Sequence, residues 1–241
     1  MNLYIIRHGD PNYKDDTLTE KGWREAALLA ERLKKIPCAA YYVSPLGRAQ
    51  DTASLTLRAV GREAQTLPWL QEFPGESVRA DSGFSRRAWD RYPAQWANDP
   101  LCYDRDHWME SDLYAGGNAW EEYQKVTKGL DALLEKHGYV RDGELYRAER
   151  PNRDNIMLFC HYGITCVLLS HLLGVSPVIL WHHTVSLTTS VTVLTTEERQ
   201  EGIALFRMSR FSDISHLEAA GEEPSFSARF CETFDSDERH N

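Results

Sequence analysis

The chain has 241 residues, of which 42% are hydrophobic and 26% are charged, and its formal net charge is −9. This length and composition are ordinary for a folded protein built as one large domain. The negative charge argues against nucleic acid or an anionic membrane surface as a partner. A small anionic substrate is not excluded, because a pocket with two or three arginines can be locally positive on an acidic protein.

The five cysteines indicate neither a disulfide framework nor a zinc knuckle, because their number is odd and no CxxC spacing occurs. We therefore expect a reducing, cytoplasmic setting. No apolar run reaches the length of a membrane span. The N-terminus also lacks the basic region and long apolar stretch of a signal peptide, so we expect no membrane partner.

In the first third of the chain, short apolar runs alternate with helical patterns. The apolar runs predict strands at 2–7, 40–43 and 64–67. The segments 20–36 and 48–60 between them carry apolar residues at helical spacing and predict helices. Such alternation is typical of βαβ units and a largely parallel sheet.

Residues 73–118 interrupt this pattern with an insertion rich in aromatic residues and arginine. A segment of this length in a compact domain is usually functional or has structure of its own. One interpretation is a small cap with an aromatic core, and the other is a lid that contacts a second anionic group of the substrate. The arginines available to such a lid are Arg79, Arg86, Arg87, Arg91 and Arg105.

The remaining elements complete the predicted fold. A helix is expected over 118–137, a hairpin around the turn Asp142-Gly143, a strand at 156–160 and a helix at 164–173. The runs 186–194 and 203–208, with the polar turn 196–202 between them, predict an antiparallel hairpin at the sheet edge. Residues from about 218 are acidic and poorly patterned, and we expect a loose tail.

Together these elements predict a three-layer α/β/α fold with a mostly parallel central sheet and antiparallel C-terminal edge strands. We expect residues 1–241 to form a single domain that carries the insertion. The sequence does not indicate an oligomeric state.

Polar side chains follow each of the four inner strands. In a parallel sheet the carboxyl ends of the strands meet at one edge, where ligands bind. Arginine neutralises and orients phosphate oxygens, and a neutral histidine can serve as a nucleophile. The candidates in chain order are Arg7, His8, Arg48, Glu72, Glu76 and His161.

Three motifs occur in order along the chain. They are Arg7-His8-Gly9, then Leu-Thr-Glu-Lys-Gly-Trp-Arg-Glu-Ala at 18–26, then Ser-Pro-Leu-Gly-Arg-Ala-Gln-Asp-Thr-Ala at 44–53. They resemble the Arg-His-Gly, Leu-Thr-x-x-Gly-x-x-Gln-Ala and Ser-x-x-x-Arg-Ala-x-x-Thr-Ala signatures of the histidine phosphatase superfamily, which has the phosphoglycerate-mutase-like fold. The position of His161, after a predicted strand and before Gly163, also resembles that of the second histidine in this family. The resemblance spans most of residues 2–195 outside the insertion.

This resemblance implies roles for the candidate residues. His8 would be the nucleophile that becomes phosphohistidine. Arg7, Arg48 and His161 would hold the phosphoryl oxygens and stabilise the charge of the transition state. Glu72 would protonate the leaving oxygen and then activate water. The family needs no metal or other cofactor, because these cationic groups supply the positive charge.

The sequence departs from the family pattern at three places. Asp10 and Pro11 stand where many relatives carry Glu or Gln followed by Ser or Thr, and Tyr162 stands where a small residue is common. Both differences concern the rim of the pocket and therefore the substrate. The surroundings of Glu72 match the family's acid motif only in part, so Glu76 remains an alternative acid.

Several alternatives are left open by the sequence. Because Tyr162, and not Asp, follows His161, the acid phosphatase branch is not favoured. A metal site made by His182 and His183 with His107 or Cys160 has no common ligand spacing. For the function, a phosphatase acting on a small phosphorylated substrate is expected first. A phosphoglycerate-type mutase and a non-catalytic phospholigand-binding protein are the alternatives.

Overall fold

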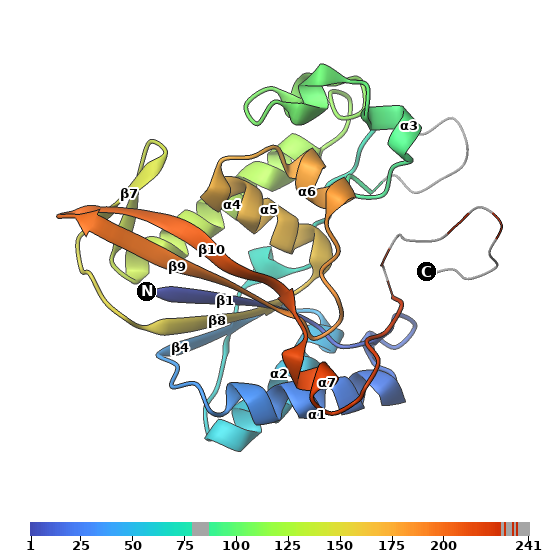
Figure 1. The fold of residues 1–241 in the computed structure, drawn as a ribbon. Helices are drawn as coiled ribbons and strands as arrows, with labels where there is room; N and C mark the ends of the chain where they lie inside the picture. The colour runs from blue at the N-terminus through green and yellow to red at the C-terminus, as the bar shows by residue number, and fades with distance from the viewer. Residues whose placement is uncertain (79–86, 228, 230–232, 234, 236–241) are drawn as a thin grey trace.

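The computed structural model of the protein describes residues 1–78, 87–227, 229, 233 and 235. A central sheet of eight strands runs through the molecule in the order β5-β4-β8-β1-β9-β10-β7-β6 (Figure 1). Its strands are β1 (Asn2–Arg7), β4 (Ala40–Val43), β5 (Gln65–Thr66), β6 (Tyr139–Asp142), β7 (Leu145–Ala148), β8 (Asn155–Cys160), β9 (Val191–Gln200) and β10 (Ile203–Asp213). The short strands β2 (Pro11–Asn12) and β3 (Thr17–Leu18) form a separate ribbon.

The sheet has a parallel half and an antiparallel half. The strands β5, β4, β8 and β1 are parallel, whereas β9, β10, β7 and β6 each pair antiparallel with their neighbours. The strand β1 is central, and Arg7 at its end lies in register with Cys160 at the end of β8. The residues that follow these two strands therefore leave the sheet side by side.

Helices cover both faces of the sheet, as predicted. In Figure 1, α1 (Glu20–Leu33) and α2 (Gly47–Val60) lie on one side, and α4 (Ala119–Lys136), α5 (Tyr162–Leu173) and α6 (Pro177–His183) lie on the other. The alternating side chains of β8 divide between these layers. Met157 and Phe159 pack in the core beneath α1 and α2, whereas Ile156 and Leu158 belong to the larger core of the opposite face.

The predicted helices and inner strands have nearly the observed bounds. α1 begins after Thr19, whose hydroxyl accepts a hydrogen bond from the Gly22 N–H at 3.1 Å. α2 and α5 end at Gly61 and Gly174, which have φ of 63° and 67°, conformations that favour glycine. α5 starts two residues earlier than expected, directly after His161.

The C-terminal hairpin differs from the prediction. β9 begins at Val191, not at 186, and continues to Gln200 through most of the polar segment that was expected to be a turn. β10 begins at Ile203 as expected but continues to Asp213. The reason is that this end of the hairpin is solvated, so charged side chains extend the ladder without being buried. Glu197 forms ion pairs with Arg199 on its own strand and with Arg207 on the facing strand.

The described part of the insertion contains α3 (Pro93–Trp96) and two short 3-10 helices, η2 (Pro100–Tyr103) and η3 (Trp108–Glu110). It has buried aromatic side chains, and the Trp108 ring meets the Trp181 ring of α6 edge to face with centroids 5.7 Å apart. The aromatic side chains of this segment thus pack against α6, and the cap stays a prediction.

Two arginines of the insertion, Arg91 and Arg105, are engaged by protein groups. Arg91 is buried and donates to the Val78 carbonyl. Arg105 pairs with Glu144 outside the insertion. Arg79 and Arg86 lie outside the described residues, so the lid stays a prediction.

The segment after α7 (Ser215–Glu218) differs from the expected loose tail. Lys21 of α1 forms an ion pair with Glu222 at 2.8 Å. The backbone N–H of Ser225 donates to the Glu25 carboxylate at 2.9 Å. Residues 222–227 therefore lie against the N-terminal half of α1, at the end that faces the carboxyl edge of the sheet.

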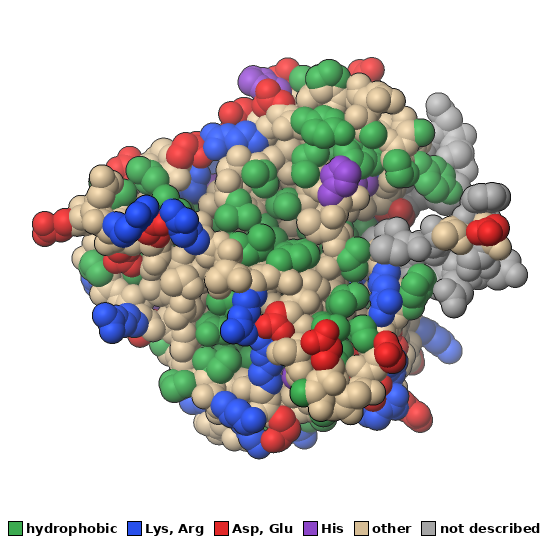
Figure 2. All heavy atoms as spheres, viewed as in Figure 1, with side chains coloured by type: hydrophobic (Ala, Val, Ile, Leu, Met, Phe, Trp, Pro, Cys, Tyr) green, Lys and Arg blue, Asp and Glu red, His purple; other side chains and the backbone are tan. Residues whose placement is uncertain are grey.

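The surface carries charges of both signs without a large uniform patch on the face drawn in Figure 2. Among the helices of the described residues, none combines the length and the apolar composition needed to cross a bilayer. The four described cysteines, Cys38, Cys102, Cys160 and Cys166, are free thiols.

Candidate active site

The predicted site residues gather where β1, β4 and β8 end. His8 follows β1, His161 follows β8, and their ring centroids are 5.0 Å apart. Arg7 is the last residue of β1, and Arg48 lies in the first turn of α2. His8, His161 and Arg7 are each at most 2% exposed. The sheet edge thus holds two cations and two imidazoles in a largely enclosed space.

The surroundings of His8 leave its Nε2 atom unprotonated, with a lone pair that can attack. The Nδ1 atom lies 2.7 Å from the Gly9 carbonyl oxygen, which can only accept, so Nδ1 carries the proton. Burial, followed by the charges of Arg7 and Arg48, lowers the pKa of His8 well below its ordinary value. The ring is therefore neutral near pH 7, as a nucleophile requires.

The backbone of His8 is fixed from two sides. Its N–H donates to the Cys160 carbonyl at 3.0 Å, and its carbonyl accepts from the Thr189 N–H at 3.1 Å. Thr189 has φ of 54°, a left-handed conformation that is rare for a β-branched residue. Strain of this kind persists only where surrounding contacts hold it.

His161 has the same tautomer, with its hydrogen on Nδ1. Its Nε2 lies 2.7 Å from the Ser44 hydroxyl, and that hydroxyl already accepts a hydrogen bond from the Leu46 N–H at 3.2 Å. The Ser44 proton is then available for Nε2, which leaves the hydrogen of His161 on Nδ1. Burial, followed by His8, Arg48 and Arg7, lowers the pKa of this neutral ring well below its ordinary value.

Both arginines are oriented by protein oxygens. Arg7 donates from Nη1 to the Ser186 carbonyl and from Nη2 to the Ser227 carbonyl, the latter at 3.3 Å. Arg48 donates from Nη1 to the Asp16 carboxylate at 2.6 Å. The second Asp16 oxygen accepts from the Gly47 N–H at 2.6 Å, so one carboxylate holds both the side chain and the helix start.

Three buried nitrogens of this cluster have no hydrogen-bond partner among the described residues. They are Arg7 Nε, Arg48 Nε and His161 Nδ1. Buried donors are nearly always satisfied, so a set of unsatisfied ones at one place calls for a ligand. All three carry hydrogen, and the ligand must therefore be rich in acceptor oxygens.

The structure separates the two acid candidates. Glu72 Oε1 accepts hydrogen bonds from the Phe73 N–H at 2.7 Å and from the Ile164 N–H, in the first turn of α5, at 3.1 Å. Glu76 is exposed, and its backbone N–H donates to the Asn118 side chain before α4. Glu72 is thus the carboxylate tied to the helix that begins after His161.

Two departures from the family pattern have structural explanations. The Tyr162 ring is buried with its centroid 6.0 Å from Arg7 Cζ, and its hydroxyl donates to the Thr184 carbonyl at 2.9 Å. Asp10 accepts from the Thr19 hydroxyl at 2.6 Å and from the Ser225 hydroxyl. Tyr162 thus packs beside Arg7, and Asp10 links the loop after His8 to the C-terminal segment.

The histidines considered for a metal do not meet. His182 lies against Trp96, with ring centroids 4.9 Å apart, and His107 pairs with Asp104 at 3.1 Å. Across the described residues, no cluster of three His, Cys, Asp or Glu side chains is placed to hold a metal ion.

Sequence reasoning missed the residues that hold the site together. Ser44 and Asp16 orient His161 and Arg48, as described above. Glu25 is fully buried and accepts hydrogen bonds from three donors: the N–H groups of Asp10 and Ser225 and the hydroxyl of Thr188. Burial raises the pKa of Glu25 above its ordinary value. A signal for Glu25 was present, because it occupies the Gln position of the family motif.

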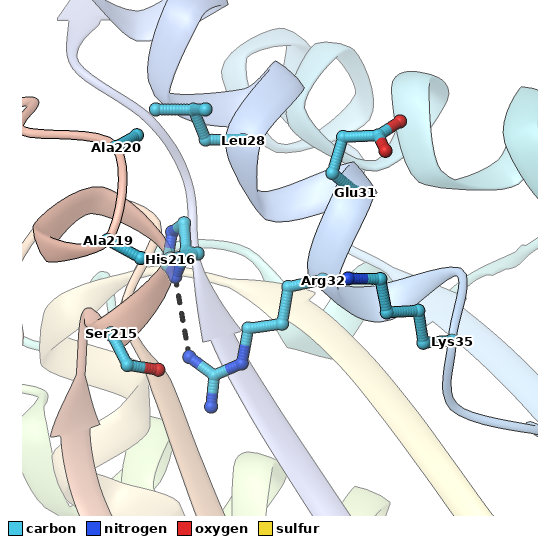
Figure 3. A pocket seen from close by; sticks show the side chains of 8 residues that line it. All are labelled: Leu28, Glu31, Arg32, Lys35, Ser215, His216, Ala219 and Ala220. Atoms are coloured by element: carbon cyan, nitrogen blue, oxygen red, sulfur yellow. Dashed lines mark hydrogen bonds between the residues drawn. The ribbon is translucent and has the colours of Figure 1, made fainter.

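An open groove of about 360 Å³ lies away from this cluster, between α1 and α7. Figure 3 shows Arg32 of α1 pointing to the His216 ring of α7, with Nη1 and Nδ1 3.3 Å apart. The other ring nitrogen of His216 lies 3.1 Å from the Thr189 hydroxyl. The groove is therefore connected through His216 to Thr189, which holds the His8 backbone, but it is not part of the phosphate-facing cluster.

Comparison with known proteins gives a consistent picture. Residues 3–208 match the family described as histidine phosphatase superfamily (branch 1). A Salmonella typhi protein named adenosylcobalamin/alpha-ribazole phosphatase is 25% identical over 193 residues, covering 76% of this chain and 84% of that protein. A Cronobacter sakazakii protein named "Probable phosphoglycerate mutase" is 32% identical over 81 residues, covering 30% of this chain and 38% of that protein.

Solved structures share the fold. A phosphoserine phosphatase mutant of Entamoeba histolytica, in complex with phosphoserine, has a TM-score of 0.58 and 17% identity, covering 90% of this chain and 98% of that chain. A mycobacterial glucosyl-3-phosphoglycerate phosphatase has a TM-score of 0.60 and 20% identity, covering 88% and 98%. These likenesses confirm the predicted fold class.

Proposed function

The chain belongs to the histidine phosphatase superfamily, and on that premise we propose that it is a metal-independent phosphatase of a small phosphorylated metabolite, acting through a phosphohistidine on His8. The prediction of a histidine phosphatase is confirmed at the level of the family and enzyme class. The roles of the individual residues and the substrate are the content of the proposal.

The set of unpartnered nitrogens carries the proposal. Arg7 Nε, Arg48 Nε and His161 Nδ1 are buried hydrogen-bond donors around the His8 ring, without a partner among the described residues. A phosphoryl group offers three acceptor oxygens and negative charge, which matches three donors of which two are cationic. The same donors stabilise charge as it spreads over those oxygens in the transition state.

In the first step, His8 Nε2 attacks the phosphorus and forms an N–P bond. The P–O bond to the leaving group breaks, and its electron pair remains on the leaving oxygen. Glu72, protonated at that stage, gives its proton to this oxygen. The product is an alcohol, and the protein keeps a phosphohistidine and an ionised Glu72.

In the second step, the Glu72 carboxylate takes a proton from a water molecule, and the water oxygen attacks the phosphorus. The N–P bond breaks, its electron pair returns to His8 Nε2, and inorganic phosphate leaves. Glu72 is protonated again, so the cycle closes. The bond from His8 Nδ1 to the Gly9 carbonyl supports the positive charge that the ring gains while phosphorylated.

A small phosphomonoester is the substrate class that the enclosed site supports. Named relatives and neighbours include phosphatases of alpha-ribazole, phosphoserine and glucosyl-3-phosphoglycerate. The relatives named as probable mutases match over 81 and 151 residues, less than the 193 residues matched by the alpha-ribazole phosphatase, and this supports hydrolysis over mutase activity. The free thiols at Cys38, Cys102, Cys160 and Cys166 support a cytoplasmic setting as part of the proposal.

The proposal is tested by turnover of p-nitrophenyl phosphate and of a panel of phosphorylated metabolites. We expect His8→Ala to abolish phosphate release and EDTA to leave it intact. Rapid quenching of the wild-type protein should trap acid-labile phosphate, and His8→Ala should trap none. Full activity of His8→Ala would refute the mechanism, and isomerisation of 3-phosphoglycerate faster than phosphate release would favour the mutase.

A further inference from the structure

The C-terminal segment reaches the phosphate-facing cluster, and we propose that it supplies a further phosphate-binding residue, Ser227. This inference rests on the proposed function and adds a substrate contact to it. The match to the family ends at residue 208, so the contact comes from a part of the chain that the family match does not include.

Two atoms of Ser227 are involved. Its carbonyl oxygen lies 3.3 Å from Arg7 Nη2, which places the residue beside the guanidinium. Its hydroxyl oxygen is buried and has no hydrogen-bond partner among the described residues. Ser227 Oγ is thus a fourth unsatisfied polar atom, next to the residue that contributes Arg7 Nε to the same set.

The chemistry of a hydroxyl suits this position. A serine hydroxyl donates one hydrogen bond, and a phosphoryl oxygen is a charged acceptor that would satisfy it. The carbonyl of the same residue holds Arg7 at one N–H and leaves Nε directed elsewhere. Ser227 would therefore orient Arg7 with its backbone and bind the phosphoryl group with its side chain.

The segment is held in place by a latch on Glu25. The Ser225 N–H donates to Glu25 Oε1 at 2.9 Å, and the Ser225 hydroxyl donates to Asp10. The Ser227 N–H in turn donates to the Ser225 hydroxyl oxygen at 3.0 Å. Two residues thus connect the buried carboxylate of α1 to the hydroxyl beside Arg7.

An ionised Glu25 is needed to accept all three of its donors. An amide in place of the carboxylate cannot accept from all three. With its oxygen toward Asp10 the Ser225 N–H faces the NH₂ group, and with its oxygen toward Ser225 the Asp10 N–H does. Because the Ser225 hydroxyl also donates to Asp10, Glu25→Gln should loosen the C-terminal segment in either orientation.

The first test is Ser227→Ala. Loss of one hydrogen bond to a charged acceptor should raise the KM for p-nitrophenyl phosphate, and the Ki for inorganic phosphate, about tenfold. The matched control is Ser209→Ala on β10, whose hydroxyl donates to the Val193 carbonyl and which should leave both constants unchanged. Unchanged constants in Ser227→Ala would overturn the inference, whereas the proposed function would still stand if His8→Ala were inactive.

The second test is a double-mutant cycle. Glu25→Gln is expected to raise the same two constants, and the double variant should be no worse than the more impaired single variant, because both changes remove one contact. Additive effects would show that Glu25 acts independently of Ser227 and would overturn the latch. The far-ultraviolet circular dichroism of each variant, matched to the wild type, shows that the fold is intact.

Discussion

Glu72 Oε1 accepts a hydrogen bond from the backbone N–H of Ile164, 3.1 Å away. The donor belongs to the first turn of α5, the helix that starts immediately after His161. The start of α5 therefore fixes the positions of Glu72 and His161 relative to each other.

We predict that Glu72→Gln slows both steps of the reaction. The amide oxygen can still accept from Ile164, so the position of the side chain is kept, but proton transfer is lost. The kcat should fall 100-fold or more for an alkyl phosphate, on the order expected for a lost general acid. With p-nitrophenyl phosphate, whose leaving group needs little protonation, phosphohistidine should accumulate after rapid quenching.

Glu76→Gln is the matched control, since it removes the same charge from a neighbouring exposed residue. Its kcat should stay within about twofold of the wild type. If Glu76→Gln were the more impaired variant, the assignment of the acid would be wrong.

A second prediction concerns Gly163, which lies between His161 and Ile164. A Cβ atom there would come within 2.6 Å of the Trp89 ring and 2.9 Å of Glu72 Oε1. Gly163→Ala should lower kcat at least tenfold by displacing the acid. Alanine is a better helix former than glycine, and this should offset part of the stability lost to the clash. We therefore expect a small change in the urea midpoint beside the large fall in kcat. Measurements of kcat and of the urea midpoint check this, and an unchanged kcat would contradict it.

The sequence allowed prediction of the sheet edge because of its regular spacing. Arg7 ends an apolar strand, His8 and His161 directly follow apolar strands, and the carboxyl ends of parallel strands must meet. Arg48 stands in the first turn of the helix after such a strand. These positions depend on local patterns, and the structure brings them together as expected.

The contacts that support the site could not be predicted in the same way. Glu25 meets Ser225, which is 200 residues away, and no periodicity relates the two. Residues 186–190 are β-rich in composition but form a loop, because Thr189 turns the chain with φ of 54° to reach the His8 carbonyl. Long-range pairings of this kind depend on tertiary packing that single-sequence patterns do not record.

A third prediction concerns the orientation of Arg48. In Asp16→Asn, the side chain cannot accept from both the Gly47 N–H and Arg48 Nη1, which each lie 2.6 Å from a carboxylate oxygen. In either orientation of the amide the guanidinium loses its charged acceptor and is held less firmly, so the KM for p-nitrophenyl phosphate should rise about three- to tenfold. Asp15→Asn makes the same change in net charge one residue away and should leave KM unchanged. Equal effects of the two variants would mean that charge, and not orientation, matters.

A fourth prediction concerns stability at acidic pH. Burial, followed by the Arg32 charge, lowers the pKa of His216 to about 4, whereas an unfolded histidine has a pKa of about 6.5. Between these values the unfolded state binds more protons, so the free energy of unfolding falls as pH drops from about 6.5 towards 4. The full stability is present above pH 6.5.

Urea titrations at pH 7 and pH 5 check this prediction. In His216→Gln, the loss of stability between the two pH values should be smaller than in the wild type by roughly 1–2 kcal/mol. His107 provides a control of opposite sign, because its hydrogen bond with Asp104 raises its pKa. That pair stabilises the fold below the unfolded pKa. In His107→Gln, the loss of stability between pH 7 and pH 5 should therefore be no smaller than in the wild type. If His216→Gln lost as much stability between pH 7 and pH 5 as the wild type does, protonation of His216 in the folded protein would cost nothing and the prediction would be wrong.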